Sequence, residues 1–257
     1  MKVIAILQAR TSSSRLPNKV LLPILGEPML ARQIERVLRA TEITELIVAT
    51  SNESSDDRIV EVCDMMDVSC FRGDLNDVLD RFYQAGLHAR ADHIVRLTGD
   101  CPLISPDIID LVIRKHLNSG ADYTTNCMPP SFPDGLDVEI AKFSVIKEIW
   151  QSAVLPSERE HVTLAILDKK RNYELANFCS KNDLSDHRWT VDEPTDFEFV
   201  AEIYARLYQQ NNEFDVADIL ALLESEPRLY HLNSNINRNE GLQKSFSKDR
   251  EFISGGQ

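Results

Sequence analysis

The sequence predicts an α/β fold in which a mostly parallel, twisted sheet lies between two layers of helices. Short apolar runs, rich in β-branched residues, recur from residue 3 to residue 97, and segments of helical periodicity separate them. This alternation is typical of strands joined by helical crossovers. The 257 residues are also 43% hydrophobic, which suits one large domain with a well-buried core.

The expected strands and helices alternate regularly up to about residue 120. One helix has clear ends, because Ser105 can cap it, Pro106 lies in its first turn and Gly120 can stop it. Asn76 is the expected cap of the preceding helix. The expected strands are 3–7, 46–49, 68–71 and 93–97, and the expected helices are 29–38, 56–66, 76–87 and 105–120.

The order of elements changes in residues 123–177, which we interpret as an inserted segment or lid. A strand at 188–191 and helices at 195–207 and 216–223 follow it. Capping boxes predict that two helices start at Ser157, with Glu160, and at Thr195, with Glu198. We expect a single domain over residues 1–233 and a polar tail over 234–257. In the inserted segment the expected strands are 123–126, 136–140 and 173–177, and the helices are 144–152 and 157–169.

Charge and cysteine content exclude several classes of protein. The formal net charge is −13, so nonspecific binding to nucleic acid is not expected. The five cysteines form no C-x-x-C pair, which argues against a disulfide framework and a zinc site and favours a reducing cytoplasm. No apolar run approaches the roughly 20 residues of a membrane span, so membrane insertion is not expected either.

A basic loop of small residues directly follows the first strand. It reads Q-A-R-T-S-S-S-R-L-P-N-K over residues 8–19, and no acidic residue precedes Glu27. Small side chains let backbone N–H groups approach a polyphosphate, while Arg10, Arg15 and Lys19 supply positive charge. An ordinary flexible surface loop is the alternative interpretation. The chain has neither a P-loop nor a G-x-G-x-x-G pattern, so the predicted phosphate site is of another kind.

Two carboxylates stand at the ends of predicted strands. Asp100 lies in G-D-C-P-L (residues 99–103), and Asp192 lies in V-D-E-P-T-D (residues 191–196). Mg²⁺ bound to substrate phosphates typically needs only one or two protein carboxylates, so this pair predicts a magnesium site. Asp100 alone would be read as an ordinary turn residue, and Asp196 suits the positive end of a helix without any catalytic duty.

Taken in order, the loop and the two acidic segments resemble the cytidylyltransferase family that includes acylneuraminate and 3-deoxy-manno-octulosonate cytidylyltransferases. The resemblance is strongest to its spore-coat polysaccharide branch, which shares loops of the form Q-A-R-x-x-S-x-R-L-P-x-K. Further matches at 72–74 with 77–81, at 133–139 and at 158–162 extend it over about residues 3–205.

This resemblance implies the Rossmann-like fold of nucleotide-diphospho-sugar transferases. It also implies Mg²⁺-dependent transfer of CMP from CTP to a sugar or sugar acid, with release of pyrophosphate, in the biosynthesis of a surface polysaccharide or other glycan. Because members of the family often dimerise through the inserted segment, a homodimer through residues 123–177 is the implied assembly.

The resemblance further implies roles for individual residues. Arg15 and Lys19 would hold the β- and γ-phosphates, and Asp100 would complete the catalytic group. Asp100 and Asp192 would bind the Mg²⁺ that aligns the α-phosphate. The implied nucleotide site consists of Leu7, Gln8, Ala9, Arg10, Ser12, Ser13, Ser14, Arg15, Lys19 and Thr98.

Two groups of polar residues predict the acceptor site. Asp134, Asp137 and Glu139 can accept hydrogen bonds from sugar hydroxyls, and Arg159 and His161 can meet the carboxylate of a sugar acid. A turn followed by a half-exposed strand explains the three acids equally well. A solvated helix face is an equal explanation for Arg159.

Two departures from the family pattern leave other functions open. Ser12 and Asn18 stand where the family usually has Gly, and a positive φ at either position would be less favourable than with Gly. A module that binds nucleotide without turnover is therefore one alternative. A glycosyltransferase of the same fold is another, but the spacing of Asp134 and Asp137 does not match its D-x-D metal motif. The residues themselves select neither the base, nor the sugar, nor the pathway.

Overall fold

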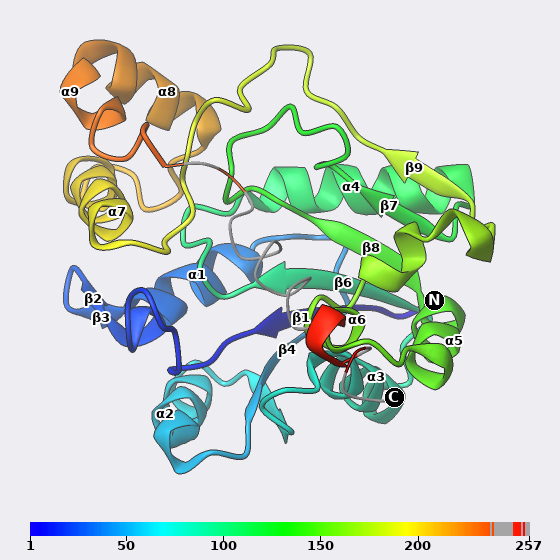
Figure 1. The fold of residues 1–257 in the computed structure, drawn as a ribbon. Coiled ribbons are helices and arrows are strands. Elements are labelled where there is room, and N and C mark those ends of the chain that lie inside the picture. Colours follow the sequence, from blue (N-terminus) through cyan, green and yellow to red (C-terminus); the bar gives the residue numbers. More distant parts are fainter. Residues whose placement is uncertain (237, 239–248, 253, 255–257) are drawn as a thin grey trace.

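The structure is a computed structural model that describes residues 1–236, 238, 249–252 and 254. Within this part of the chain, seven strands form one sheet in the order β5-β4-β1-β6-β8-β7-β9, and helices cover both of its faces (Figure 1). The expected three-layer α/β fold is therefore confirmed. The strands are β1 (Val3–Gln8), β4 (Glu45–Ser51), β5 (Ser69–Gly73), β6 (His93–Thr98), β7 (Tyr123–Thr125), β8 (Glu139–Lys142) and β9 (Leu175–Asn177).

Strand β1 lies at the centre of the fold. Its neighbours β4 and β6 both run parallel to it, and the register places Gln8 beside Ala49 and Thr98. The odd-numbered apolar residues of β1 belong to one hydrophobic cluster and the even-numbered ones to another, so the strand is buried on both faces. Strand β8 is antiparallel to both β6 and β7, which makes the sheet mostly parallel rather than wholly so.

Helices pack on both faces of the sheet. Helices α1, α2, α4, α7 and α8 contribute to the cluster on one face, and α3 and α5 contribute to the other. In the described chain, no helix combines the length and apolar character needed to cross a membrane. The helices are α1 (Met29–Val37), α2 (Asp57–Met65), α3 (Val78–Ala89), α4 (Pro106–Ser119), α5 (Phe143–Ser152), α6 (Pro156–Glu160), α7 (Pro194–Leu207), α8 (Val216–Ser225) and α9 (Pro227–Tyr230).

Helix α4 has the ends that the sequence predicts. The Ser105 hydroxyl accepts the Ile108 N–H, Pro106 starts the helix, and Gly120 follows it in a left-handed conformation with φ of 69°. Helix α3 is capped one residue later than expected, because the carboxylate of Asp77 rather than the side chain of Asn76 accepts a backbone N–H.

One helix expected after residue 155 is shorter than predicted. Helix α6 begins at Pro156 and ends at Glu160, so the expected helix over 157–169 is wrong. Val162 has φ of +41°, which breaks the α-helical path, and short 3₁₀ turns follow. The capping box of Ser157 and Glu160 is wrong as well, because the Ser157 hydroxyl donates to Asp249 while Glu158 accepts two backbone N–H groups before the helix.

The strand expected at 188–191 is replaced by an irregular segment with a single isolated bridge between Arg188 and Asp134. It lies between two loops, where Trp189 N–H donates to Asp134 O and Val191 N–H donates to Asp100 O. The segment therefore has loops rather than strands as hydrogen-bond partners. Helix α7 then starts at Pro194, and Asp196 rather than Glu198 closes its capping box.

Residues 123–177 supply β7, β8 and β9 to the main sheet. Their roles as a lid and as a dimer interface stay predictions.

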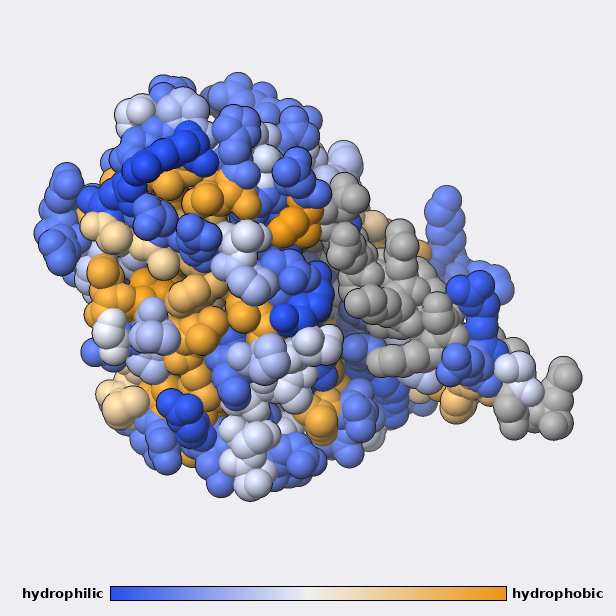
Figure 2. Space-filling view, turned by 60° about the vertical axis from the view of Figure 1, so that its left-hand side comes forward, coloured by the Kyte–Doolittle hydropathy of each residue, from blue (hydrophilic) through white to orange (hydrophobic). Residues whose placement is uncertain are grey.

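Much of the expected tail over 234–257 lies outside the described residues, but its Arg238 and Asp249 contact the body of the domain. On the face shown in Figure 2, hydrophilic residues surround an extended group of apolar residues.

Gly135 holds the loop before β8 against the segment that leads to Asp192. Its φ is +108°, and a Cβ built there would lie 2.6 Å from the backbone of Trp189 and Thr190. A left-handed conformation alone costs a residue with a Cβ roughly 1–2 kcal/mol. We expect Gly135→Ala to lower the free energy of unfolding by more than that, because the neighbouring backbone must also move.

Gly120→Ala is the matched control for this substitution. Gly120 also has a positive φ, of +69°, but nothing lies within 4 Å of a Cβ built on it. Urea denaturation of both variants measures the difference, and equal losses of stability would show that the contact at Gly135 imposes no constraint.

Candidate active site

The candidate site lies where β1 and β6 end side by side. The loop over residues 9–19 leaves β1, and the turn over 99–103 leaves β6. These two segments touch, because Gly99 N–H donates to Gln8 O at 2.8 Å and a Cβ at Gly99 would stand 2.8 Å from the same oxygen. A glycine at position 99 is thus what allows the basic loop and the acidic turn to meet.

Asp56 anchors the start of the basic loop. Its carboxylate accepts both the backbone N–H and the hydroxyl of Thr11, at 2.8 and 2.6 Å, and also the hydroxyls of Thr50 and Ser51. Burial alone would raise the pKa of Asp56, but these hydrogen bonds lower it below the ordinary value. Thr11 O in turn accepts the N–H groups of two later loop residues, so the loop has a defined shape.

The two departures from the family pattern have different outcomes. Asn18 adopts a left-handed conformation with φ of 58°, the region that Asn tolerates better than most residues that carry a Cβ. Ser12 has no positive φ, so it is not strained there. Neither residue prevents the loop from forming.

Lys19 joins the two carboxylates that the sequence singles out. Its Nζ donates to Asp100 Oδ2 at 2.9 Å, to Asp192 Oδ1 at 2.8 Å and to Val191 O at 2.8 Å. Burial opposes the charge on Lys19, but the two carboxylates outweigh it and raise its pKa. Burial likewise opposes ionisation of Asp100, yet the Lys19 ammonium and nearby hydrogen bonds lower the pKa of Asp100 to about 2. Lys19 and Asp100 are therefore both charged at neutral pH.

Arg15 reaches the same group from the other side of the loop. Its guanidinium lies 2.7 Å from Asp192 Oδ2 and 3.6 Å from Glu193 Oε1. Arg188 also approaches Asp192, at 3.4 Å. The structure thus brings together the predicted catalytic residues Arg15, Lys19 and Asp100.

Asp196 fixes the position of Asp192 through hydrogen bonds to the backbone. It is fully buried, and its carboxylate accepts the backbone N–H groups of Asp192 and Glu193, each at 2.9 Å. Arg188 donates to both of its oxygens at 2.9 Å, and Asn233 donates to one of them. The sequence attributes to Asp196 only a favourable place near the helix start, whereas the structure makes it a positioning residue.

Asp134 and Asp137 lie beside this group. Asp134 pairs with Arg188 at 3.0 Å, and Asp137 pairs with Arg238 from the chain's C-terminal part. Burial raises the pKa of Asp134 to about 6 against the effect of Arg238, and the Asp100 carboxylate adds to this rise. Burial also raises the pKa of Asp137. Asp134 is therefore electrostatically coupled to Asp100, one of the two carboxylates at Lys19.

Glu139 belongs to a separate network. Arg96 donates to its carboxylate at 2.5 Å, and the hydroxyls of Tyr123 and Thr163 donate to it as well. Arg96 also donates to the Gln8 side chain at 3.3 Å, which links this network to the end of β1. Glu139 is thus engaged within the protein rather than presented alone to a sugar.

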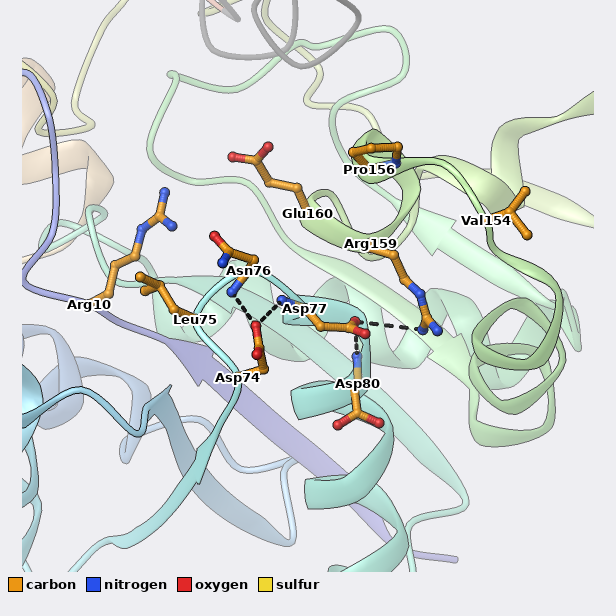
Figure 3. Close-up of a pocket in the computed structure, with 10 residues that line it drawn as sticks. All are labelled: Arg10, Asp74, Leu75, Asn76, Asp77, Asp80, Val154, Pro156, Arg159 and Glu160. Carbon is orange, nitrogen blue, oxygen red and sulfur yellow. Dashed lines mark hydrogen bonds and ion pairs between the residues drawn. The ribbon is translucent and has the colours of Figure 1, made fainter. Parts of the chain in front are cut away.

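A pocket of about 630 Å³ opens between the loop after β5 and helix α6 (Figure 3). Arg10 enters it from the basic loop, and Arg159 lies on the opposite side with its guanidinium 3.6 Å from Asp77 Oδ1. The residues that line it include neither His161 nor the three predicted acceptor acids. The predicted acceptor residues therefore do not line one common pocket, and their shared role in binding the acceptor stays a prediction.

Four residues that the sequence does not single out complete the site. Arg188 is the clearest, because an arginine in a run expected to be a buried strand signals a buried ionic partner. Arg96 carries the same signal, because it interrupts the strand expected at 93–97. Asp56 and Arg238 show no sequence signal, since contacts between distant segments define them.

Comparison with known proteins shows the family of the chain. The model of a family described as cytidylyltransferase matches residues 4–235. The chain belongs to the cytidylyltransferase family. It is accordingly a nucleotidyltransferase by family, as the resemblance in its motifs predicts.

The chain is similar to several individual proteins. It is 28% identical to the spore coat polysaccharide biosynthesis protein SpsF of Bacillus subtilis, over 88% of this chain and 95% of that protein. It is 36% identical to the mitochondrial 3-deoxy-manno-octulosonate cytidylyltransferase of Arabidopsis thaliana, over 53% of this chain and 47% of that protein. A solved cytidylyltransferase from Leptospira borgpetersenii superposes with a TM-score of 0.86 at 31% identity, covering 92% of this chain and 98% of that one.

Substitution of Asp196 tests its role beneath the site. We expect Asp196→Asn to lower the free energy of unfolding by about 3 kcal/mol or more, because the buried Arg188 loses a charged partner. Asp183→Asn is the control, since Asp183 is exposed and, within the described part of the chain, bonds only to the nearby Ser185. The control should change stability by less than about 0.5 kcal/mol. Urea denaturation of both variants decides, and similar small losses would contradict the assignment.

The raised pKa of Asp134 predicts a specific pH dependence of stability. Its pKa is about 6 in the folded chain against an ordinary 3.8. Between these values the folded state keeps a proton that the unfolded state releases, so this residue's contribution to the free energy of unfolding falls as pH rises. Asp134→Asn cannot ionise and lacks this term. Denaturation at several pH values should show stability shifting in favour of the variant as pH rises, and a constant difference would contradict the assignment.

Proposed function

We propose that this cytidylyltransferase transfers CMP from CTP to a hydroxyl group of a sugar or sugar acid and releases pyrophosphate, with Mg²⁺ as cofactor. The observation that carries the proposal is the group formed by Lys19, Asp100 and Asp192 at the carboxyl ends of β1 and β6. Parallel α/β sheets bind their ligands at this edge. The family and the names of its relatives support CTP as the nucleotide.

The donor set fits Mg²⁺. Asp100 and Asp192 offer carboxylate oxygens, the ligand type that this ion prefers, and both lie within 2.9 Å of one ammonium nitrogen. Among the described residues no group of three or more acidic, histidine or cysteine side chains is arranged for a metal. Two carboxylates suffice when substrate phosphates supply further ligands. Bound there, Mg²⁺ would neutralise phosphate charge and align the α-phosphate for in-line attack.

The basic residues would bind the triphosphate. Arg15 and Lys19 leave the same loop and reach the same carboxylates, so their charges converge where β- and γ-phosphates would lie. They would stabilise the negative charge that develops on the departing pyrophosphate. Backbone N–H groups of the loop would add hydrogen bonds to phosphate oxygens, because residues 12–14 carry only small side chains.

The acceptor would approach from the side of Asp134 and Asp137. Both carboxylates carry oxygens that accept hydrogen bonds from hydroxyl groups, and Arg188 joins Asp134 to Asp192. The relative in spore coat polysaccharide synthesis supports a role in surface glycan assembly. Assembly as a homodimer through residues 123–177 is part of the same proposal.

Pyrophosphate release tests the proposal directly. The protein is incubated with Mg²⁺, with one of CTP, UTP, GTP or ATP, and with a panel of sugar acids, neutral sugars and sugar phosphates. We expect release with CTP and at least one acceptor. Binding of CTP without release of pyrophosphate across the panel would favour the module without turnover. Release of pyrophosphate with another nucleotide instead of CTP would overturn CTP as the substrate.

Asp100→Asn connects the reaction to the site. It removes a charged ligand but keeps the shape of the side chain, so pyrophosphate release should fall about 100-fold or more. Asp107→Asn is the matched control, because Asp107 is an exposed carboxylate in the first turn of α4. Its activity should stay near that of the unchanged protein. Near-normal release by Asp100→Asn would overturn the metal assignment.

A further inference from the structure

All three N–H groups of the Lys19 ammonium are already used. An ammonium has three donors and no acceptor. Nζ has three oxygen acceptors at 2.8–2.9 Å: one oxygen each of Asp100 and Asp192, and the carbonyl of Val191. In this arrangement no N–H of Lys19 is left for a phosphate oxygen. The lysine therefore cannot hold a triphosphate and keep its present contacts at once.

The same ammonium stands where a divalent ion would share the two carboxylates. Hydrogen bonds donated by Nζ orient one oxygen of Asp100 and one of Asp192 toward a single point. Two carboxylates directed at one point repel each other unless a cation lies between them. Lys19 is 8% exposed, so bulk water does little to screen this charge. In this arrangement the lysine thus performs the electrostatic task of a metal ion between the two carboxylates.

The local backbone allows the side chain to leave without a change of fold. Lys19 starts a short 3₁₀ turn with Val20 and Leu21, which are both buried, and Asn18 before it is fixed in a left-handed conformation. The backbone at this point is therefore held, while the lysine side chain has a flexible four-carbon stem. A shift of Nζ from carboxylate to phosphate needs only new side-chain torsions.

We propose that Lys19 is an internal cation that occupies the divalent-metal site of the nucleotide-free protein and passes from the carboxylates to the triphosphate when metal and nucleotide enter. This inference rests on the proposed function, since it presumes that Asp100 and Asp192 hold the metal. It means that the free protein binds a divalent ion weakly, because the ion must displace a buried, fully bonded ammonium. Nucleotide gives the ammonium new acceptors, so nucleotide and metal strengthen each other's binding.

Manganese binding to the nucleotide-free full chain tests this inference. Electron paramagnetic resonance measures the concentration of free Mn²⁺ during titration of three proteins: the unchanged protein, Lys19→Gln and a control, Lys147→Gln. Lys147 is exposed on α5, so its loss changes the net charge equally but leaves the site intact. We expect Lys19→Gln to bind Mn²⁺ about tenfold more tightly or better, and the control to match the unchanged protein. An additional Asp100→Asn substitution should abolish the gain.

A second measurement uses the unchanged protein and does not depend on how the variant folds. The Lys19 ammonium is buried and donates to three oxygens, which slows the exchange of its protons and makes ¹H–¹⁵N NMR the suitable probe. Mg²⁺ alone should leave its resonance in place, and Mg²⁺ with CTP should shift it. A shift with Mg²⁺ alone at the same concentration, or unchanged Mn²⁺ affinity in Lys19→Gln, would overturn the inference.

The results separate this inference from the proposed function. Pyrophosphate release by the unchanged protein, together with no gain of Mn²⁺ affinity in Lys19→Gln, overturns the inference and leaves the function standing. A gain of Mn²⁺ affinity in a protein that turns over no nucleotide supports the internal cation and rejects the function.

Discussion

The parallel pairing of β1 with β6 determines where the residues of the candidate site lie. Its register sets Gln8 beside Thr98, so the two strands end at the same level and their loops leave from one edge of the sheet. Residues 81 positions apart in sequence, Lys19 and Asp100, meet across this edge. Gly99 permits the close approach, and without it the basic loop and the acidic turn would be held apart.

Charge balance within the site contrasts with the charge of the whole chain. The protein carries a net charge of −13, yet Lys19, Arg15 and Arg188 converge on Asp192. Buried ion pairs of this kind contribute little net stability, because desolvation of the charges offsets much of their attraction. These ion pairs instead hold the charged side chains of the site in defined positions. Asp196 illustrates this, since it orients the backbone before α7 and takes up one side of Arg188.

The parts of the fold that local sequence determines are predicted well. Strands β1 and β4 are recognisable because burial on both faces requires unbroken apolar runs, and α4 is recognisable because its cap and its stop are local. Asp100 follows from the same logic, since it stands just after the end of β6, whereas Asp192 joins it although the segment before it is not a strand. Elements set by distant contacts are not predictable in this way.

Residues 188–191 and helix α6 show why. The first segment has a strand-like sequence but bonds to loops around Asp134 and Asp100, and nothing local distinguishes the two outcomes. Helix α6 has a plausible continuation in sequence, but the backbone at Val162 turns away. Asp56 and Arg238 act through partners that are 45 and 101 residues away, which a reading of neighbouring residues cannot supply.

The left-handed backbone at Asn18 bears on how such chains are recognised. Position 18 requires a residue that tolerates φ near 58°. It does not require a residue without a side chain, because the turn closes through backbone hydrogen bonds. Asn and Gly both meet that requirement. A search pattern that demands Gly before the loop lysine would therefore pass over sequences whose loop has the same conformation, whereas one that accepts either residue would retain them.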